Sequence, residues 1–110
     1  MLTSTLTQEL NLLHADFCSA LADPTRLLLL YSLAEKPCNV SELTQLLSLP
    51  QPMISRHLKI LRDRGLVEAT RQGTTVQYSL TNPRIIDALD ILRSVMRDLI
   101  EHRASLVENA

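Results

Sequence analysis

The chemistry that this sequence offers most clearly is a cluster of cations on one short segment. The stretch from Leu49 to Glu68 contains four of the eleven Lys and Arg residues, although the formal net charge of the chain is -1. Residues 51–75 carry five cations against two anions, a net charge of +3, so the rest of the chain carries -4. A basic segment on an acidic body indicates a local anionic partner rather than a general affinity for polyanions.

The basic segment is expected to form a helix with its cations on one side. Pro52 suits the first turn of such a helix, and Gly65 suits the left-handed residue that ends it. Three apolar residues at helical spacing form the inward stripe: Ile54, Leu58 and Leu61. The opposite side shows side chains able to reach phosphates and base edges in a DNA groove: Gln51, Pro52, Met53, Ser55, Arg56, Lys59 and Asp63.

Position along this helix separates the DNA contacts that we expect. Residues near the start of a recognition helix meet base edges, so base contacts are assigned to Gln51, Ser55 and Arg56, with Met53 against a thymine methyl group. Lys59 and Arg62 lie further along and are assigned to phosphates. The tip of a following hairpin would touch the flanking backbone or the minor groove through Arg71, Gln72, Thr74 and Thr75.

Two other readings of the charged face are open. It could be an ordinary solvated helix face, or the surface of a winged helix used for protein interaction, although such a surface would be acidic or apolar rather than basic. An enzyme is not expected, because the chain has only two glycines, no glycine-rich loop and no paired carboxylates set apart from solvated helix faces. Retention on a DNA column that falls with salt would separate DNA binding from protein binding.

Composition limits the class of protein. A chain of 110 residues supports one domain, and 45% hydrophobic residues with 3% aromatic residues and much Leu favour helices. No apolar run approaches the roughly 20 residues that cross a bilayer, and the N-terminus lacks the features of a secretory signal. With two cysteines, a reduced cytoplasmic setting is expected, without a disulfide framework and without a membrane partner.

The elements around the basic helix complete a mainly helical fold with a small β-hairpin, a winged helix-turn-helix spanning residues 1–110. A first helix is expected at about 5–22, and a second begins at Pro24 after an Asp23 N-cap. A short third helix is expected at Glu42–Leu47 after a Ser41 N-cap, with Leu43, Leu46 and Leu47 inward. The strands "LVEATR" and "TVQYSL" meet around Gly73, and Asn82-Pro83 begins a last helix at about 83–107.

Three stretches in this order and spacing carry a resemblance to a known family: "ALADPTRLLLL", "SRHLKILRDRGLVE" and "GTTVQYSL". They resemble the ArsR/SmtB family of bacterial winged-helix repressors, over roughly Phe17 to Leu99. The resemblance implies a homodimer formed by the first and last helices, an inverted-repeat operator, and repression that an inducer relieves. It also implies that His57 is a partly buried, hydrogen-bonding residue.

The apolar stripes of the terminal helices agree with a dimer. Their positions are Leu6, Leu10, Leu13, Phe17, Ile85, Leu89, Leu92, Met96 and Leu99. A single small domain would struggle to bury both stripes, although an intramolecular core is the alternative.

The inducer sites of the family do not transfer to this chain. The thiol site at the start of the third helix is replaced by Asn39-Val40-Ser41-Glu42-Leu43, and the cysteines of a recognition-helix site by Ile60 and Arg64. The metal ligands of the last helix are replaced by Asn82, Arg84 and Val95, which leaves only Asp98.

The remaining donors are two thiols and three histidines. His14 and Cys18 lie four residues apart on the first helix, and Asp98 and His102 lie four residues apart on the last. These four are the candidate metal ligands, but each pair alone is too small for a closed zinc site unless the other pair or a partner subunit adds ligands. Cys18 and Cys38 are the candidate effector or redox residues, and they would bind a metalloid such as arsenite or react with a sulfur species. Cys18 is expected to be a buried hydrophobe and Cys38 an accessible loop thiol. An effector-free regulator is the alternative.

Overall fold

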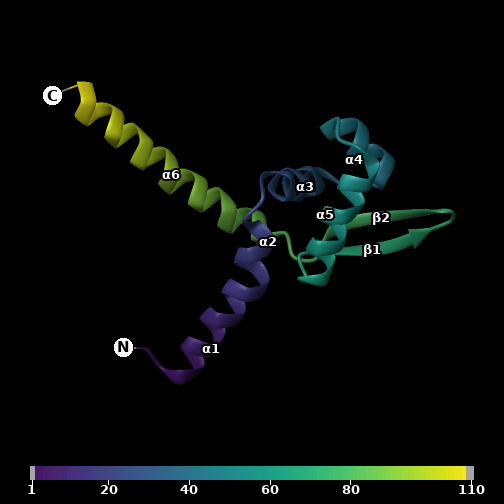
Figure 1. The fold of residues 1–110 in the computed structure, drawn as a ribbon, viewed down its shortest axis with the longest axis horizontal. Coiled ribbons are helices and arrows are strands. Elements are labelled where there is room, and N and C mark those ends of the chain that lie inside the picture. Colours follow the sequence, from purple (N-terminus) through teal and green to yellow (C-terminus); the bar gives the residue numbers. More distant parts are fainter. Residues whose placement is uncertain (1, 109–110) are drawn as a thin grey trace.

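The computed structural model describes residues 2–108, which form helices and one β-hairpin (Figure 1). In chain order the elements are α1 (Ser4–Leu12), the π-helical turn η1 (Leu13–Cys18), α2 (Ser19–Leu21), α3 (Pro24–Glu35), α4 (Val40–Leu47), α5 (Gln51–Asp63), β1 (Val67–Gln72), β2 (Thr75–Leu80) and α6 (Arg84–Glu108). The expected mainly helical fold with a hairpin wing is confirmed.

The core lies where α3, α4 and α5 pack against one another and against the hairpin. Six side chains are almost completely buried there: Leu29, Leu30, Leu43, Ile54, Leu58 and Leu61. Three of them, Ile54, Leu58 and Leu61, are the predicted inward stripe of α5, so that prediction is confirmed. Burying a Leu or Ile side chain contributes about 1.5–3 kcal/mol, so this stripe fixes α5 to the body of the domain.

The start of α4 differs from the prediction. Ser41 is not its N-cap; Asn39 is, and the helix begins at Val40. The Asn39 side chain accepts a hydrogen bond from the Glu42 N–H, and the Glu42 carboxylate accepts one from the Asn39 N–H, at 2.8 and 3.0 Å. This reciprocal capping box satisfies two otherwise free N–H groups, which a cap at Ser41 would not do.

The inward face of α4 also needs a correction at one position. Leu43 is fully buried and Leu47 half-buried, but Leu46 is 61% exposed. Leu43 and Leu47, four residues apart, share a helix face, whereas Leu46 lies about 100° around the helix from Leu47 and points into solvent.

The turns that bound α5 and the hairpin have left-handed backbones. Gly65 (φ 81°) follows α5, and Gly73 (φ 65°) joins the strands, as predicted. Ser48 (φ 54°) ends α4 in the same region without being a glycine. The antiparallel hairpin pairs Val67 with Leu80 and Gln72 with Thr75. These turns place the hairpin beside α5.

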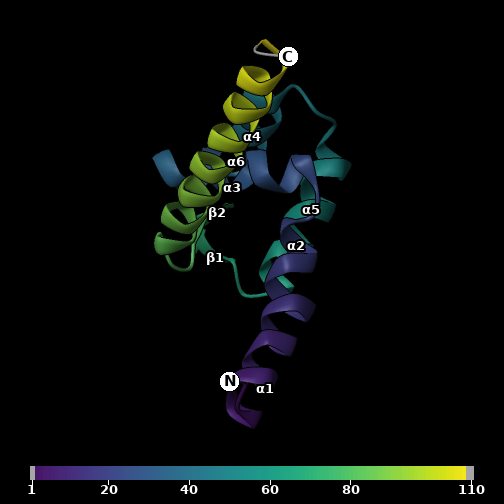
Figure 2. The same cartoon turned by 90° about the vertical axis from the view of Figure 1, so that its left-hand side faces the viewer.

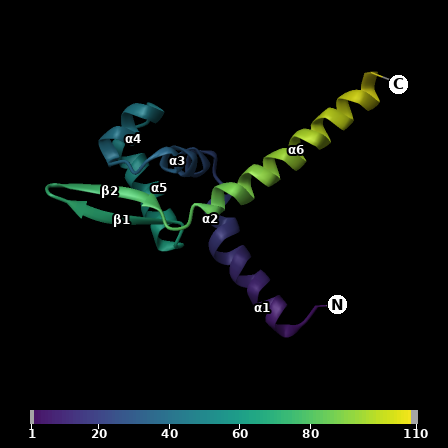
Figure 3. The same ribbon diagram turned by 180° about the vertical axis from the view of Figure 1, so that it is seen from behind.

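The terminal helices extend from the body as two arms that diverge from the side opposite the hairpin (Figures 1 and 3). The first arm is the expected helix over 5–22, but it is not regular, because residues 13–18 form a π-helical turn. The second arm is α6, whose start is capped by the Asn82 side chain, which accepts from the Arg84 N–H at 3.0 Å.

The arms leave much of the apolar surface uncovered. The radius of gyration is 17.2 Å, compared with about 13 Å for a compact chain of this size. Of the two predicted stripes, Leu89 is buried and Ile85 half-buried, and the rest are exposed: Leu6, Leu10, Leu13, Phe17, Leu92, Met96 and Leu99. The alternative that both stripes belong to the intramolecular core is therefore wrong for most of their length.

Candidate nucleic-acid interface

The structure places most of the predicted DNA contacts on the outer side of α5. Gln51, Pro52, Arg56, Lys59 and Arg62 are exposed, whereas Met53 and Ser55 are half-buried. The inner side of the same helix is fixed by Ile54, Leu58 and Leu61. The outer side chains are thus displayed by a helix that cannot rotate without exposing its apolar stripe.

The polar side chains of this face differ in their partners. The Gln51 amide donates to the Ser55 hydroxyl at 2.8 Å, so these two candidate base contacts are held together. Lys59 forms an ion pair with Asp63 at 3.1 Å, four residues on. The side chains of Arg56 and Arg62 form no hydrogen bond or ion pair within residues 2–108. Their charge is available to an external anion, while that of Lys59 is partly compensated.

The wing supplies the remaining candidate contacts. Arg71, Gln72, Thr74 and Thr75 are all exposed at the end of the hairpin, which projects beyond α5 (Figure 1). The Thr75 hydroxyl donates to the Gln72 carbonyl at 3.0 Å and tightens the turn. The exposed cations therefore lie on two elements, α5 and the end of the wing, where Arg71 belongs to β1.

His57 is buried on the inner side of α5, as the family resemblance implied, and its partner is a residue that the sequence did not reveal. The Arg26 guanidinium lies 3.2 Å from His57 Nδ1. Since arginine can only donate, Nδ1 is the acceptor and the ring proton is on Nε2. Arg26 belongs to the quoted stretch "ALADPTRLLLL", which was the only sequence signal for it.

The N-cap beside Arg26 is ionised more readily than an ordinary aspartate. Asp23 accepts hydrogen bonds from the N–H groups of Thr25 and Arg26, at 2.8 and 3.1 Å. Desolvation raises the pKa of Asp23, but these hydrogen bonds and the nearby positive charge of Arg26 outweigh it, so the net pKa is lowered. The folded protein therefore keeps the charge of this cap to a lower pH than an ordinary aspartate would, and the contribution of the cap to stability is lost as the pH falls from the usual aspartate pKa through the lowered one.

The two thiols have the opposite exposures to those predicted. Cys18 is exposed, and Cys38 is only 2% exposed. Cys38 is buried because its backbone forms an isolated antiparallel bridge with Tyr78, with N–O distances of 3.0 and 2.8 Å. Burial, aided by the negative charges of Glu42 and Glu35 and opposed by Lys36, raises the pKa of the Cys38 thiol.

We expect the two thiols to react at different rates with a disulfide reagent. At neutral pH the raised pKa and the burial of Cys38 leave little accessible thiolate, so Cys18 reacts first and Cys38 reacts only as the fold opens. The release of thionitrobenzoate over time measures this. Cys18→Ser should remove the fast phase and Cys38→Ser should keep it; a fast phase that survived in Cys18→Ser would contradict the assignment.

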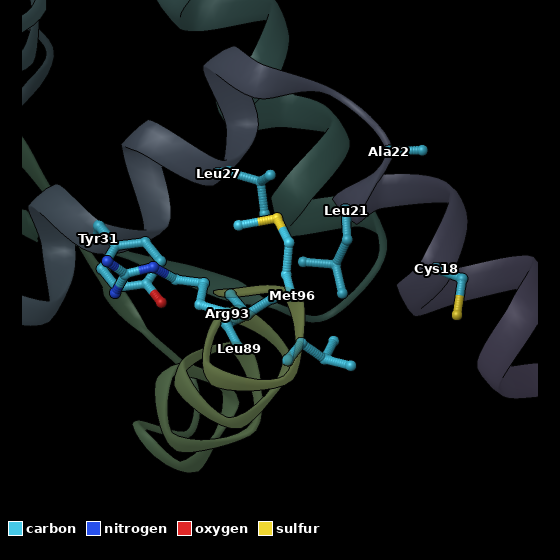
Figure 4. A pocket seen from close by; sticks show the side chains of 9 residues that line it. Cys18, Leu21, Ala22, Leu27, Tyr31, Leu89, Arg93 and Met96 are labelled. Carbon is cyan, nitrogen blue, oxygen red and sulfur yellow. The ribbon is translucent and has the colours of Figure 1, made fainter. Parts of the chain in front are cut away.

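Cys18 borders an apolar pocket of about 400 Å³ between the first arm, α3 and α6 (Figure 4). The other lining residues are Leu21, Ala22, Leu27, Tyr31, Leu89, Leu92, Arg93 and Met96. At one side Arg93 lies over the Tyr31 ring, 5.3 Å from its centroid, and the Tyr31 hydroxyl donates to Asp90 at 2.6 Å. The pocket lies where the two arms diverge.

The candidate metal ligands are not brought together within one chain. His14, Cys18, Asp98 and His102 are all exposed, the first two on one arm and the last two on the other. Over the described residues 2–108, no three His, Cys, Asp or Glu side chains are grouped so that they could hold a metal ion. Any shared ion would need ligands from a second chain.

Among the helices of residues 2–108, none combines the length and the hydropathy that crossing a bilayer requires.

Comparison with known proteins agrees with this geometry. The family profile described as "Bacterial regulatory protein, arsR family" matches residues 23–69. The "Probable mercury resistance operon repressor" of Streptomyces lividans is 36% identical over 99 residues, which cover 86% of this chain and 79% of that relative.

Two solved structures extend the likeness to the fold. The crystal structure of Rv0081 from Mycobacterium tuberculosis has a TM-score of 0.78 at 33% identity, covering 86% of this chain and 96% of the other. A homodimeric winged helix-turn-helix DNA-binding domain from Mycobacterium bovis, solved by NMR, has a TM-score of 0.77 at 26% identity, covering 92% and 93%. The predicted resemblance is thus confirmed, and the chain belongs to the ArsR family of DNA-binding transcriptional regulators, which are not enzymes.

Proposed function

We propose that this protein is a repressor that binds an inverted-repeat operator as a homodimer, with one α5 in each major groove. The observation that carries the proposal is the outer face of α5, where Arg56 and Arg62 are exposed and unpaired within residues 2–108. The inner face of the helix is locked into the core. Gln51, Ser55 and Arg56 are the base contacts, and Lys59, Arg62 and the wing residues contact phosphates or the minor groove.

The dimer would form through helices at about 5–22 and 83–107 of a single domain. The exposed apolar positions of both arms support it, because large uncovered apolar patches mark interaction surfaces. The Mycobacterium bovis structure, whose fold this chain shares, is homodimeric. A symmetric dimer presents two recognition helices to two half-sites about one DNA turn apart, roughly 34 Å.

The inducer that we propose is a thiol-reactive species, either a soft metal or metalloid ion or a sulfur compound, that acts at Cys18. Cys18 is the exposed thiol and borders the pocket between the arms. The name of the Streptomyces lividans relative refers to mercury resistance, and mercury prefers thiolate ligands. Cys38, which the sequence predicted to be the accessible thiol, is too deeply buried for this role.

The test is footprinting and fluorescence anisotropy on the DNA upstream of the gene, with arsenite, zinc or a persulfide donor added in separate arms. We expect protection of an inverted repeat, with log affinity falling linearly with log salt at a slope of about -0.9 per phosphate contact. Retention of affinity at high salt, or absence of any protected repeat, would exclude the proposal. Release of DNA in wild type but not in Cys18→Ser would support the thiol effector.

A further inference from the structure

The recognition helix is attached to the first arm at two places, both made by arginines. At its C-terminal end, Arg64 donates from Nη1 to the Ala15 carbonyl at 3.0 Å and pairs with Asp16 at 3.4 Å. In its middle, His57 accepts from Arg26, which also donates to the carbonyls of Ala20 and Ser19, at 2.6 and 3.3 Å. Figures 1 and 2 both place the C-terminal part of α5 beside this arm.

Apart from the Asp16 carboxylate, the acceptors in the arm are main-chain carbonyls, which move with the helix backbone. Ala15 lies in the π-helical turn, and its carbonyl accepts from the Ser19 hydroxyl as well as from Arg64, at 2.7 and 3.0 Å. Ser19 and Ala20 belong to the last turn before the chain breaks at Ala22, where helix carbonyls lack intrahelical partners. Arg26 therefore caps the end of the arm while it holds α5.

Two attachments constrain an angle as well as a distance. His57 and Arg64 are seven residues apart, about 10 Å along the axis of α5. A single contact would let α5 pivot about it, whereas two contacts on one arm fix the direction of the helix relative to that arm. The Arg64 contacts are at the surface, with the Arg64 side chain 42% and Asp16 49% exposed, so their main effect is geometric rather than on stability.

We propose that Arg64 and Arg26 are positioning residues that set the direction of the recognition helix relative to the dimerising arm, and thereby the half-site spacing that the dimer accepts. This rests on the proposed dimeric operator binding. Neither arginine is assigned a DNA contact. Their role is to transmit the geometry of the dimer seam to the two α5 helices.

The test compares Arg64→Ala with Arg62→Ala, which removes the same charge from the same end of α5 but from a side chain without a partner in the described residues. Three DNAs are used: the footprinted operator, the same operator with one base pair inserted between its half-sites, and a single half-site. For Arg64→Ala we expect affinity for the operator to fall about tenfold, the size of a typical coupling between sites. Its affinity for the half-site should stay unchanged, so its preference for the native spacing falls.

Arg62→Ala should weaken binding to all three DNAs equally and reduce the salt dependence, as expected for a phosphate contact. Partial unfolding of Arg64→Ala would lower the active concentration equally for every DNA and leave the spacing preference intact, so the ratio tests position rather than stability. Arg26→Lys, which keeps one donor, should show a smaller shift of the same ratio.

Equal losses on all DNAs for Arg64→Ala, or an unchanged ratio, would overturn the proposal. The proposed function fails separately, and visibly, if the wild-type protein itself shows no preference for the operator over a half-site.

Discussion

Leu99→Glu is expected to convert the protein to a monomer and to weaken operator binding by roughly two to four orders of magnitude, the advantage that linking two binding units provides. Leu99 is 53% exposed on the outer half of α6 and contributes nothing to the core. In a two-fold symmetric seam each substitution occurs twice, so two carboxylates would be placed in an apolar interface. Sedimentation equilibrium and anisotropy on the operator measure the two effects.

The control for this variant lies on the same helix. Ser94→Glu adds the same charge to the polar side of α6, where Asp90 and Asp98 already lie one turn away. It should remain dimeric and bind DNA like the wild type. Both variants should keep the folded winged core, with a wild-type circular dichroism spectrum, because neither residue belongs to that core. A Leu99→Glu protein that sedimented as a dimer would place the seam elsewhere.

The patterned parts of the fold could be predicted because their signals are local. The stripe Ile54, Leu58 and Leu61 and the left-handed glycines at 65 and 73 depend only on residues a few positions apart. The cap of α4 was misplaced because Asn39 and Ser41 are both good N-cap residues, and only the reciprocal bond with Glu42 decides between them. The π-helical turn could not be predicted, because the apolar spacing of the first arm is that of an ordinary α-helix.

The contacts around the site could not be predicted because they join distant segments. Cys38 looks like a loop residue in the sequence, and it is buried only because Tyr78 in β2 pairs with it. Arg26 lies 31 residues along the chain from its partner His57, and Arg64 lies 48 residues from its partner Asp16. The outer face of α5 follows from one amphipathic pattern, but how that face is aimed depends on these tertiary contacts.

Arg56→Ala is expected to weaken binding to the operator by about 1–3 kcal/mol, or roughly 5- to 150-fold, and to relax specificity at one base position of each half-site. Arg56 is exposed near the start of α5 and has no partner within residues 2–108 to compete with DNA for its guanidinium. Its removal leaves no unsatisfied group, so the free energy of unfolding should change by less than about 0.5 kcal/mol.

The measurement that identifies a base contact is a comparison of sequences rather than a single affinity. Arg56→Ala should lose affinity for the operator while its affinity for scrambled DNA falls much less, whereas Lys59→Ala, which removes a proposed phosphate contact, should weaken binding to both DNAs alike. An arginine that touched only phosphate would weaken both DNAs alike. Equal losses for Arg56→Ala would therefore move base reading away from this residue and leave Gln51 and Ser55, joined by their own hydrogen bond, as the pair that reads the operator.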